Sequence, residues 1–107
     1  MPADGFPDGC SRDELLQVVD GLRGTRVGVV GDFGADVFIY GAPERLSREA
    51  PVPILQYDGE RIVPGMAGNV VRNLSALGST PVCVGVLGDD RPGKEVRDKL
   101  EDDRATV

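Results

Sequence analysis

Two short stretches of the sequence carry side chains that could bind a polar ligand. GDFGAD, residues 31 to 36, follows a run of β-branched residues and contains the carboxylates of Asp32 and Asp36. PGMAGN, residues 64 to 69, leads into a helical pattern and ends on the amide of Asn69. Ionised carboxylates form stronger hydrogen bonds than neutral acceptors do. These side chains are therefore suited to holding the hydroxyl groups of a sugar.

Both stretches also have a purely structural interpretation. Asp32 and Asp36 could stabilise turns by hydrogen bonding to the local backbone. Asn69 could be the N-cap of the helix that follows. In the binding interpretation, Gly65 lets a ligand approach the backbone, and Asn69 points its amide at the same ligand near a helix N-terminus. The residues alone leave these alternatives open.

Two other patterns do not indicate a cofactor or metal site. GVVGDFG, residues 28 to 34, has the spacing G-x-x-G-x-x-G instead of G-x-G-x-x-G and puts an aspartate where a pyrophosphate would lie, which disfavours dinucleotide binding. Asp89 and Asp90 precede Pro92 at a predicted helix start, where capping and the helix dipole explain them without a metal. The sequence has no histidine, which excludes Ser-His-Asp and Cys-His catalysis.

The composition is that of one small soluble domain. The 107 residues include 12 basic and 18 acidic side chains, and the net charge of -6 disfavours binding to nucleic acid or to anionic membranes. The sequence has neither an apolar run of the roughly 20 residues that span a bilayer nor a basic, then apolar N-terminus. We therefore expect a cytoplasmic protein. Cys10 and Cys83 form no disulfide framework, and Cys83 is most simply a buried apolar residue.

The periodicity of apolar residues predicts alternating helices and strands. Residues 1 to 10 are expected to be a disordered leader. Ser11 and Glu14 form a capping box for a helix that ends at Gly24. TRVGVVGDFGAD, residues 25 to 36, is typical of a strand buried on both faces, and VFIYG, residues 37 to 41, is a second extended piece.

The second half of the sequence continues the alternation. APERLSREAPVP, residues 42 to 53, is expected to be irregular, and Asp58-Gly59 is expected to be the turn of a hairpin. A helix opens near Asn69 and stops at Gly78, a buried strand covers residues 81 to 88, and a last helix starts at Pro92 with only Val96 and Leu100 facing inward. This order predicts an α/β fold with a mostly parallel sheet, which binds ligands beyond the carboxyl ends of its strands.

Four stretches, in this order and at these distances, resemble the N-terminal part of a PfkB/ribokinase-family carbohydrate kinase. They are VGVVGDFGADVFIYG, ERLSREAPVPIL, VPGMAGNVVRNLSALG and VGVLGDDRPG, and the match covers about residues 26 to 100. ERLSREAPVP is most similar to the heptose-7-phosphate kinase domain of ADP-heptose synthesis proteins. The resemblance implies that residues 11 to 107 form a partial ribokinase-like domain, with helices flanking the sheet and a small β-lid over approximately residues 37 to 63.

The resemblance also implies an activity, which is ATP-dependent phosphorylation of a sugar or of a sugar phosphate similar to heptose 7-phosphate. In such kinases, Asp36 and Asn69 would hold hydroxyl groups, Gly65 would line the sugar site, and Asp32 would support the turn. ATP and Mg²⁺ are expected for the full family domain. The family has the motif G-G-A-A-N at the positions of residues 65 to 69, and this chain has methionine in place of the second glycine. Met66 would therefore narrow the pocket, redirect its specificity or abolish binding.

The C-terminal G-A-G-D motif of the family, which supplies the catalytic base and the anion hole, has no counterpart in this sequence. We therefore assign no catalytic residue and no metal ligand, and we expect the 107-residue chain to be inactive by itself because the ATP site is missing. The alternative interpretation is a non-catalytic sugar-binding or dimerisation module, a truncated or split kinase remnant. Such a module would form a homodimer through the lid or pair with a missing C-terminal half.

Overall fold

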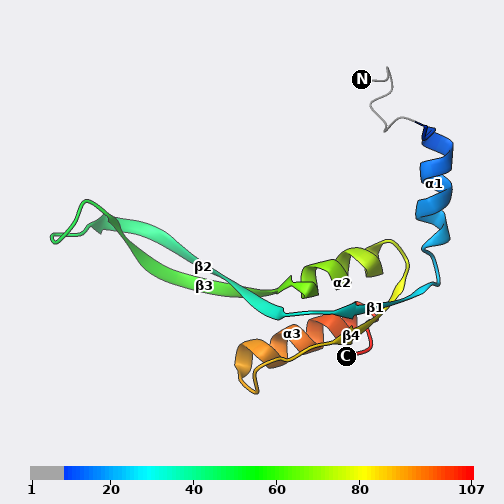
Figure 1. Cartoon of the computed structure of the whole chain (residues 1–107). Coiled ribbons are helices and arrows are strands. Elements are labelled where there is room, and N and C mark those ends of the chain that lie inside the picture. The colour runs from blue at the N-terminus through cyan, green and yellow to red at the C-terminus, as the bar shows by residue number, and fades with distance from the viewer. Residues whose placement is uncertain (1–8) are drawn as a thin grey trace.

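The computed structural model of the protein describes residues 9 to 107, which form an α/β fold as the sequence predicted. Figure 1 shows a globular part, a long two-stranded ribbon that projects from it, and a helix at the N-terminal side that stands apart. Residues 1 to 8, most of the predicted leader, lie outside the described part of the chain. The elements run in the order α1 (Arg12–Gly21), β1 (Arg26–Val30), β2 (Phe33–Leu46), β3 (Pro53–Met66), α2 (Ala67–Ala76), β4 (Thr80–Val84) and α3 (Arg91–Asp102).

The parallel sheet consists of β1 and β4. The two strands pair from Arg26 opposite Thr80 to Val30 opposite Val84. The expectation that these strands are buried on both faces is wrong, since Val30 is 78% exposed and Val84 is 56% exposed. The physical reason is that α2 packs on β1 and β4 while α3 packs on β2, β3 and α2, so the helices do not sandwich this two-stranded sheet.

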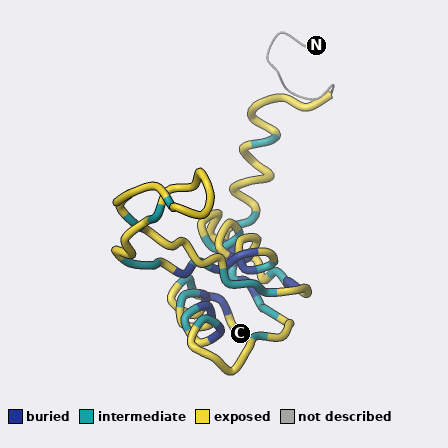
Figure 2. Tube along the Cα trace, turned by 90° about the vertical axis from the view of Figure 1, so that its left-hand side faces the viewer, coloured by how far each residue is buried: buried dark blue, intermediate teal, exposed yellow. Residues whose placement is uncertain are grey.

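The core lies where β1, the base of β3, α2 and α3 meet. Its buried apolar residues are Val29, Ile62, Val71, Val96, Leu100 and Ala105. Figure 2 shows that the buried residues gather in the globular part, whereas α1 and most of the ribbon are exposed. The inward direction of Val96 and Leu100, predicted from their i, i+4 spacing, is confirmed. Full burial of each such side chain contributes about 1.5 to 3 kcal/mol relative to exposure.

The ribbon is formed by β2 and β3, which pair antiparallel from Phe33 opposite Met66 to Leu46 opposite Pro53. Its turn lies between Ser47 and Val52, where the Ser47 N–H donates to the Val52 carbonyl at 2.9 Å. The prediction of a turn at Asp58-Gly59 is wrong, because both residues lie inside β3. Asp58 is instead the extra residue of a β-bulge, at which Gly59 pairs with Tyr40 and the next pair is Gly41 with Tyr57.

Residues 42 to 46 continue β2, so the expectation that residues 42 to 53 are all irregular is wrong. Pro43 is tolerated because each strand of a two-stranded ribbon has one edge without a partner, and proline there removes no ladder hydrogen bond. A second register shift, between Pro43 and Arg45, lies close to the turn of the ribbon. The ribbon, from Phe33 to Met66, includes residues 37 to 63 and continues beyond both ends of that range.

The helix ends follow the local chemistry. The capping box of α1 is confirmed, since the Glu14 N–H donates to the Ser11 hydroxyl at 3.2 Å and the Ser11 N–H donates to the Glu14 carboxylate at 2.8 Å. The α-helix ends at Gly21, before the predicted Gly24, and none of its residues is buried. Among the described helices, none is long and apolar enough to cross a membrane.

Candidate functional site

Asp36 and Gly65 lie on the same face of the ribbon, at its base. The register pairs Asp36 with Val63 and Gly34 with Gly65, which makes Asp36 and Gly65 diagonal neighbours. A Cβ atom added to Gly65 would lie 2.6 Å from Asp36 Oδ2 and 2.7 Å from its Cγ. Since real Cβ atoms do not approach other atoms so closely, the carboxylate can take this position only because residue 65 has no side chain.

Met66 has an unusual backbone at the junction between β3 and α2. Its φ of 54° and ψ of −124° form a conformation that favours glycine and costs other residues about 1 to 3 kcal/mol. The side chain is 63% exposed and covers Gly34, since a Cβ there would lie 2.9 Å from the Met66 sulfur. Met66 thus extends over the glycine that pairs with Gly65.

The helix α2 begins at Ala67, two residues before the predicted start. Met66 is the N-cap, without a side-chain hydrogen bond, so Asn69 occupies the third helical position and is not the N-cap. The Ala67 N–H donates to the backbone carbonyl of Asp32 at 3.0 Å. This hydrogen bond joins the first turn of α2 to the GDFGAD stretch.

The side chains of Asp32, Asp36 and Asn69 are exposed. Within residues 9 to 107, none of the side-chain hydrogen bonds or ion pairs involves them. The carboxylates therefore do not stabilise turns in the described structure. The structure brings Asp36, Gly65 and Met66 together and joins the Asp32 backbone to α2, while Asn69 makes no hydrogen bond to Asp36.

In contrast, the LGDDRPG stretch has the structural role that the sequence favoured. Asp90 is the N-cap of α3, and its carboxylate accepts a hydrogen bond from the Gly93 N–H at 2.9 Å. Asp89 forms an ion pair of 3.2 Å with Lys94. Both cysteines are free thiols, Cys10 exposed and Cys83 half-buried, and burial raises the pKa of Cys83.

Arg61 and Phe38 form the next pair on the same face as Asp36 and were not predicted as site residues. They are opposite each other in the register, and the Arg61 Cζ atom lies 5.6 Å from the centre of the Phe38 ring. Such a cation–π contact contributes about 0.5 to 1 kcal/mol when exposed. Side chains alternate along a strand, so the sequence alone places residues 36 and 38 on one face of β2. Whether residues 61, 63 and 65 of β3 lie on that same face depends on how the two strands pair.

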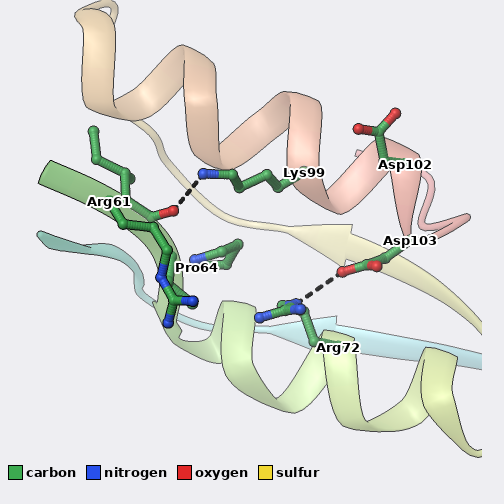
Figure 3. Close-up of a pocket in the computed structure, with 8 residues that line it drawn as sticks. Arg61, Pro64, Arg72, Lys99, Asp102 and Asp103 are labelled. Carbon is green, nitrogen blue, oxygen red and sulfur yellow. Dashed lines mark hydrogen bonds and ion pairs between the residues drawn. The ribbon is translucent and has the colours of Figure 1, made fainter. Parts of the chain in front are cut away.

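A pocket of about 320 Å³ lies between β3, α2 and α3. Figure 3 shows its charged side chains, among which the Arg72 Nε atom is 2.9 Å from an Asp103 carboxylate oxygen. Lys99 donates to the backbone carbonyl of Ile62 and approaches Glu95 at 3.8 Å. The predicted site residues do not line this pocket, so the candidate site is the exposed face at the base of the ribbon.

Curated proteins that are similar to this chain include several bifunctional HldE proteins. The chain is 52% identical to the bifunctional protein HldE of Paramagnetospirillum magneticum over 82 residues, which are 77% of this chain and 17% of that protein. It is 45% identical to the HldE of Hyphomonas neptunium over 89 residues, covering 83% and 18% of the two chains. For the HldE of Acidiphilium cryptum the identity is 48% over 83 residues, with coverages of 78% and 17%. The chain thus spans less than a fifth of these relatives, and no protein-family model matches it.

Proposed function

Because most of the chain is homologous to one segment of the bifunctional HldE proteins, we propose that it supplies the sugar-binding and lid part of a carbohydrate kinase. The proposed reaction is ATP-dependent phosphorylation of a hydroxyl group on heptose 7-phosphate or a similar sugar phosphate. The proposed binding residues are Asp36, Gly65, Met66 and Asn69, with Asp32 in support. The ribbon formed by β2 and β3 is the proposed lid.

The observation that carries this proposal is the position of the Asp36 carboxylate against Gly65. A carboxylate without a partner in the described chain can accept hydrogen bonds from sugar hydroxyls, and these are stronger than hydrogen bonds between neutral groups. The exposed amide of Asn69, in the first turn of α2, offers both a donor and acceptors for further hydroxyls. A closed ribbon would keep water from the bound sugar, which is the general role of a lid in phosphoryl transfer.

The family resemblance implies ATP and Mg²⁺ for the full domain, but the described residues do not fit a site for them. Within residues 9 to 107, no group of three or more cysteine, aspartate or glutamate side chains could hold a metal ion. The sequence also has no glycine-rich loop that ends in lysine, which cradles phosphates in P-loop proteins. We therefore assign neither ATP nor Mg²⁺ to residues of this chain, and we expect the chain to bind sugar without phosphorylating it.

Isothermal titration of the purified chain with heptose 7-phosphate tests the binding part of the proposal. Asp36→Asn removes the charge and keeps the shape, so we expect an affinity loss of about tenfold, equivalent to about 1.4 kcal/mol. Asp98→Asn is the matched control, because Asp98 is exposed on α3. Equal affinities of the two variants would exclude Asp36 from the site. Phosphorylated product after addition of ATP and Mg²⁺ would show that the chain has its own nucleotide site.

A second candidate function, dimerisation, is favoured by the apolar surface of the ribbon. Val37 and Ile39 are exposed on the face of the ribbon opposite Asp36, and exposed apolar patches mark interaction sites. Analytical ultracentrifugation over a range of concentrations tests this candidate, with Ile39→Lys expected to shift the equilibrium toward monomer. A chain that sediments as a monomer at every concentration would rule the dimer out, and pairing with a separate C-terminal half would then be tested by mixing the two pieces.

A further inference from the structure

Arg61 is a basic side chain on the same face of the ribbon as Asp36. We propose that Arg61 binds the phosphate group of the sugar phosphate, so that it determines the preference for phosphorylated over unphosphorylated sugars. The inference rests on the proposed function and goes beyond it, because it assigns the two ends of the ligand to different side chains. Asp36 takes hydroxyl groups near the base of the ribbon, and Arg61 takes the phosphate further along the ribbon.

The register places the two side chains at a suitable separation. Asp36 pairs with Val63, and the next pair on the same face is Phe38 with Arg61. Asp36 on β2 and Arg61 on β3 are therefore diagonal neighbours, which lie about 7 to 8 Å apart. A sugar ring, together with the exocyclic carbons that carry a terminal phosphate, covers a similar length. The Asp36 carboxylate lies against Gly65, toward the base of the ribbon, and Val63 is the residue between Gly65 and Arg61 on the same face. The ligand would therefore lie over Val63.

The guanidinium of Arg61 is held in place but has no anionic partner. It lies over the ring of Phe38, with 5.6 Å between Cζ and the ring centre. Figure 3 shows it pointing away from the ammonium group of Lys99. None of the ion pairs or side-chain hydrogen bonds within residues 9 to 107 involves it. A guanidinium that is stacked on an aromatic ring keeps its N–H groups for bidentate binding of phosphate, and less side-chain freedom is lost on binding.

Three other basic side chains near the base of the ribbon have carboxylate partners. Arg72 pairs with Asp103 at 2.9 Å, and Lys99 approaches Glu95. Arg91 pairs with Glu60 at 2.7 Å and with Glu95 at 2.9 Å, and these carboxylates raise its pKa further above its ordinary value. An incoming phosphate would compete with a carboxylate at each of these sites, whereas at Arg61 it would not. This difference favours Arg61 as the phosphate-binding residue.

The experiment compares heptose 7-phosphate with unphosphorylated heptose by isothermal titration of the whole chain. Arg61→Gln removes the charge, and we expect the affinity for heptose 7-phosphate to fall about tenfold or more while the affinity for heptose changes less than about twofold. Arg48→Gln is the control, because Arg48 is exposed in the ribbon turn and its substitution changes the net charge equally. Circular dichroism melting of each variant verifies that the ribbon is folded under the titration conditions.

The outcomes separate this inference from the proposed function. Similar losses of affinity for both sugars in Arg61→Gln would show that Arg61 only stabilises the ribbon through Phe38, which overturns the inference. Equal affinity of the unmodified chain for both sugars would overturn the inference and leave sugar binding intact. If neither sugar binds, both proposals are wrong. If Arg61→Lys retains only part of the phosphate preference, the bidentate geometry of arginine is supported.

Discussion

The Asp36 carboxylate occupies the space that a side chain at residue 65 would need. The distance between a Cβ at this position and Asp36 Oδ2 would be 2.6 Å. The position of the Asp36 carboxylate therefore requires glycine at residue 65, whether or not a ligand is bound. A substitution at residue 65 should therefore change both the stability of the ribbon base and the binding of sugar. These two effects can be measured separately.

We predict that Gly65→Ala destabilises the protein by about 1 to 3 kcal/mol, as overpacking does, and abolishes sugar binding. Urea unfolding and isothermal titration measure the two effects. Gly59→Ala is the control in the same strand, because a Cβ there meets no atom within 4 Å. The double variant Gly65→Ala, Asp36→Ala should regain stability but not binding. If the double variant is as unstable as Gly65→Ala alone, the contact with Asp36 is not the cause.

We predict that Met66→Gly stabilises the protein, because glycine adopts the φ of 54° without the cost that a side chain brings. Met66→Ala keeps the unfavourable backbone and removes the same long side chain, so it is the matched control. The unfolding free energy of Met66→Gly should exceed that of Met66→Ala by about 1 kcal/mol. The reverse order would mean that the backbone conformation at residue 66 is not strained.

We predict that α1 loses helical structure in acid through Glu14. Hydrogen bonds from the Ser11 backbone N–H and hydroxyl lower the pKa of Glu14 below its ordinary value. Because the folded pKa is lowered, the contribution to helix stability is complete above the ordinary value and is lost as the pH falls through the folded pKa. Amide NMR signals of α1, followed from about pH 6 to about pH 2, measure this loss.

The variant Glu14→Gln is the control for this pH dependence. Glutamine can accept the same capping-box hydrogen bond but does not titrate. We therefore expect its α1 signals to change less between the two pH limits than those of the unmodified chain. The explanation through Glu14 fails if both proteins show the same pH dependence of α1.

We predict that Gly68→Ala destabilises the protein although alanine usually stabilises a helix interior by about 1 kcal/mol relative to glycine. A Cβ at residue 68 would lie 2.8 Å from the Cβ of Pro64, so α2 would have to move away from β3. Gly28→Ala in β1 is the control, because a Cβ there meets no atom within 4 Å. Thermal unfolding should show a lower midpoint for Gly68→Ala only, and an increased midpoint would contradict the close packing.

The sequence by itself determined the features that depend on neighbouring residues. The capping box of Ser11 and Glu14 and the Asp90 cap follow from hydrogen bonds between residues three positions apart. The inward direction of Val96 and Leu100 follows from the helical period. The order of helices and strands predicted an α/β fold with a mostly parallel sheet, and β1 and β4 do pair in parallel. The resemblance to carbohydrate kinases, carried by four short stretches, agrees with the HldE relatives.

The tertiary structure decided where the ribbon turns, where α2 starts and which side chains share a face. Asp58-Gly59 has the local chemistry of a turn, but pairing along the whole of β2 and β3 places it inside a strand. A shift of the register by one residue would move Asp36 to the opposite face from Gly65 and Arg61. This register depends on contacts between residues far apart in the sequence, which no local pattern records, and so the shared face of Asp36, Gly65 and Arg61 emerged only from the folded chain.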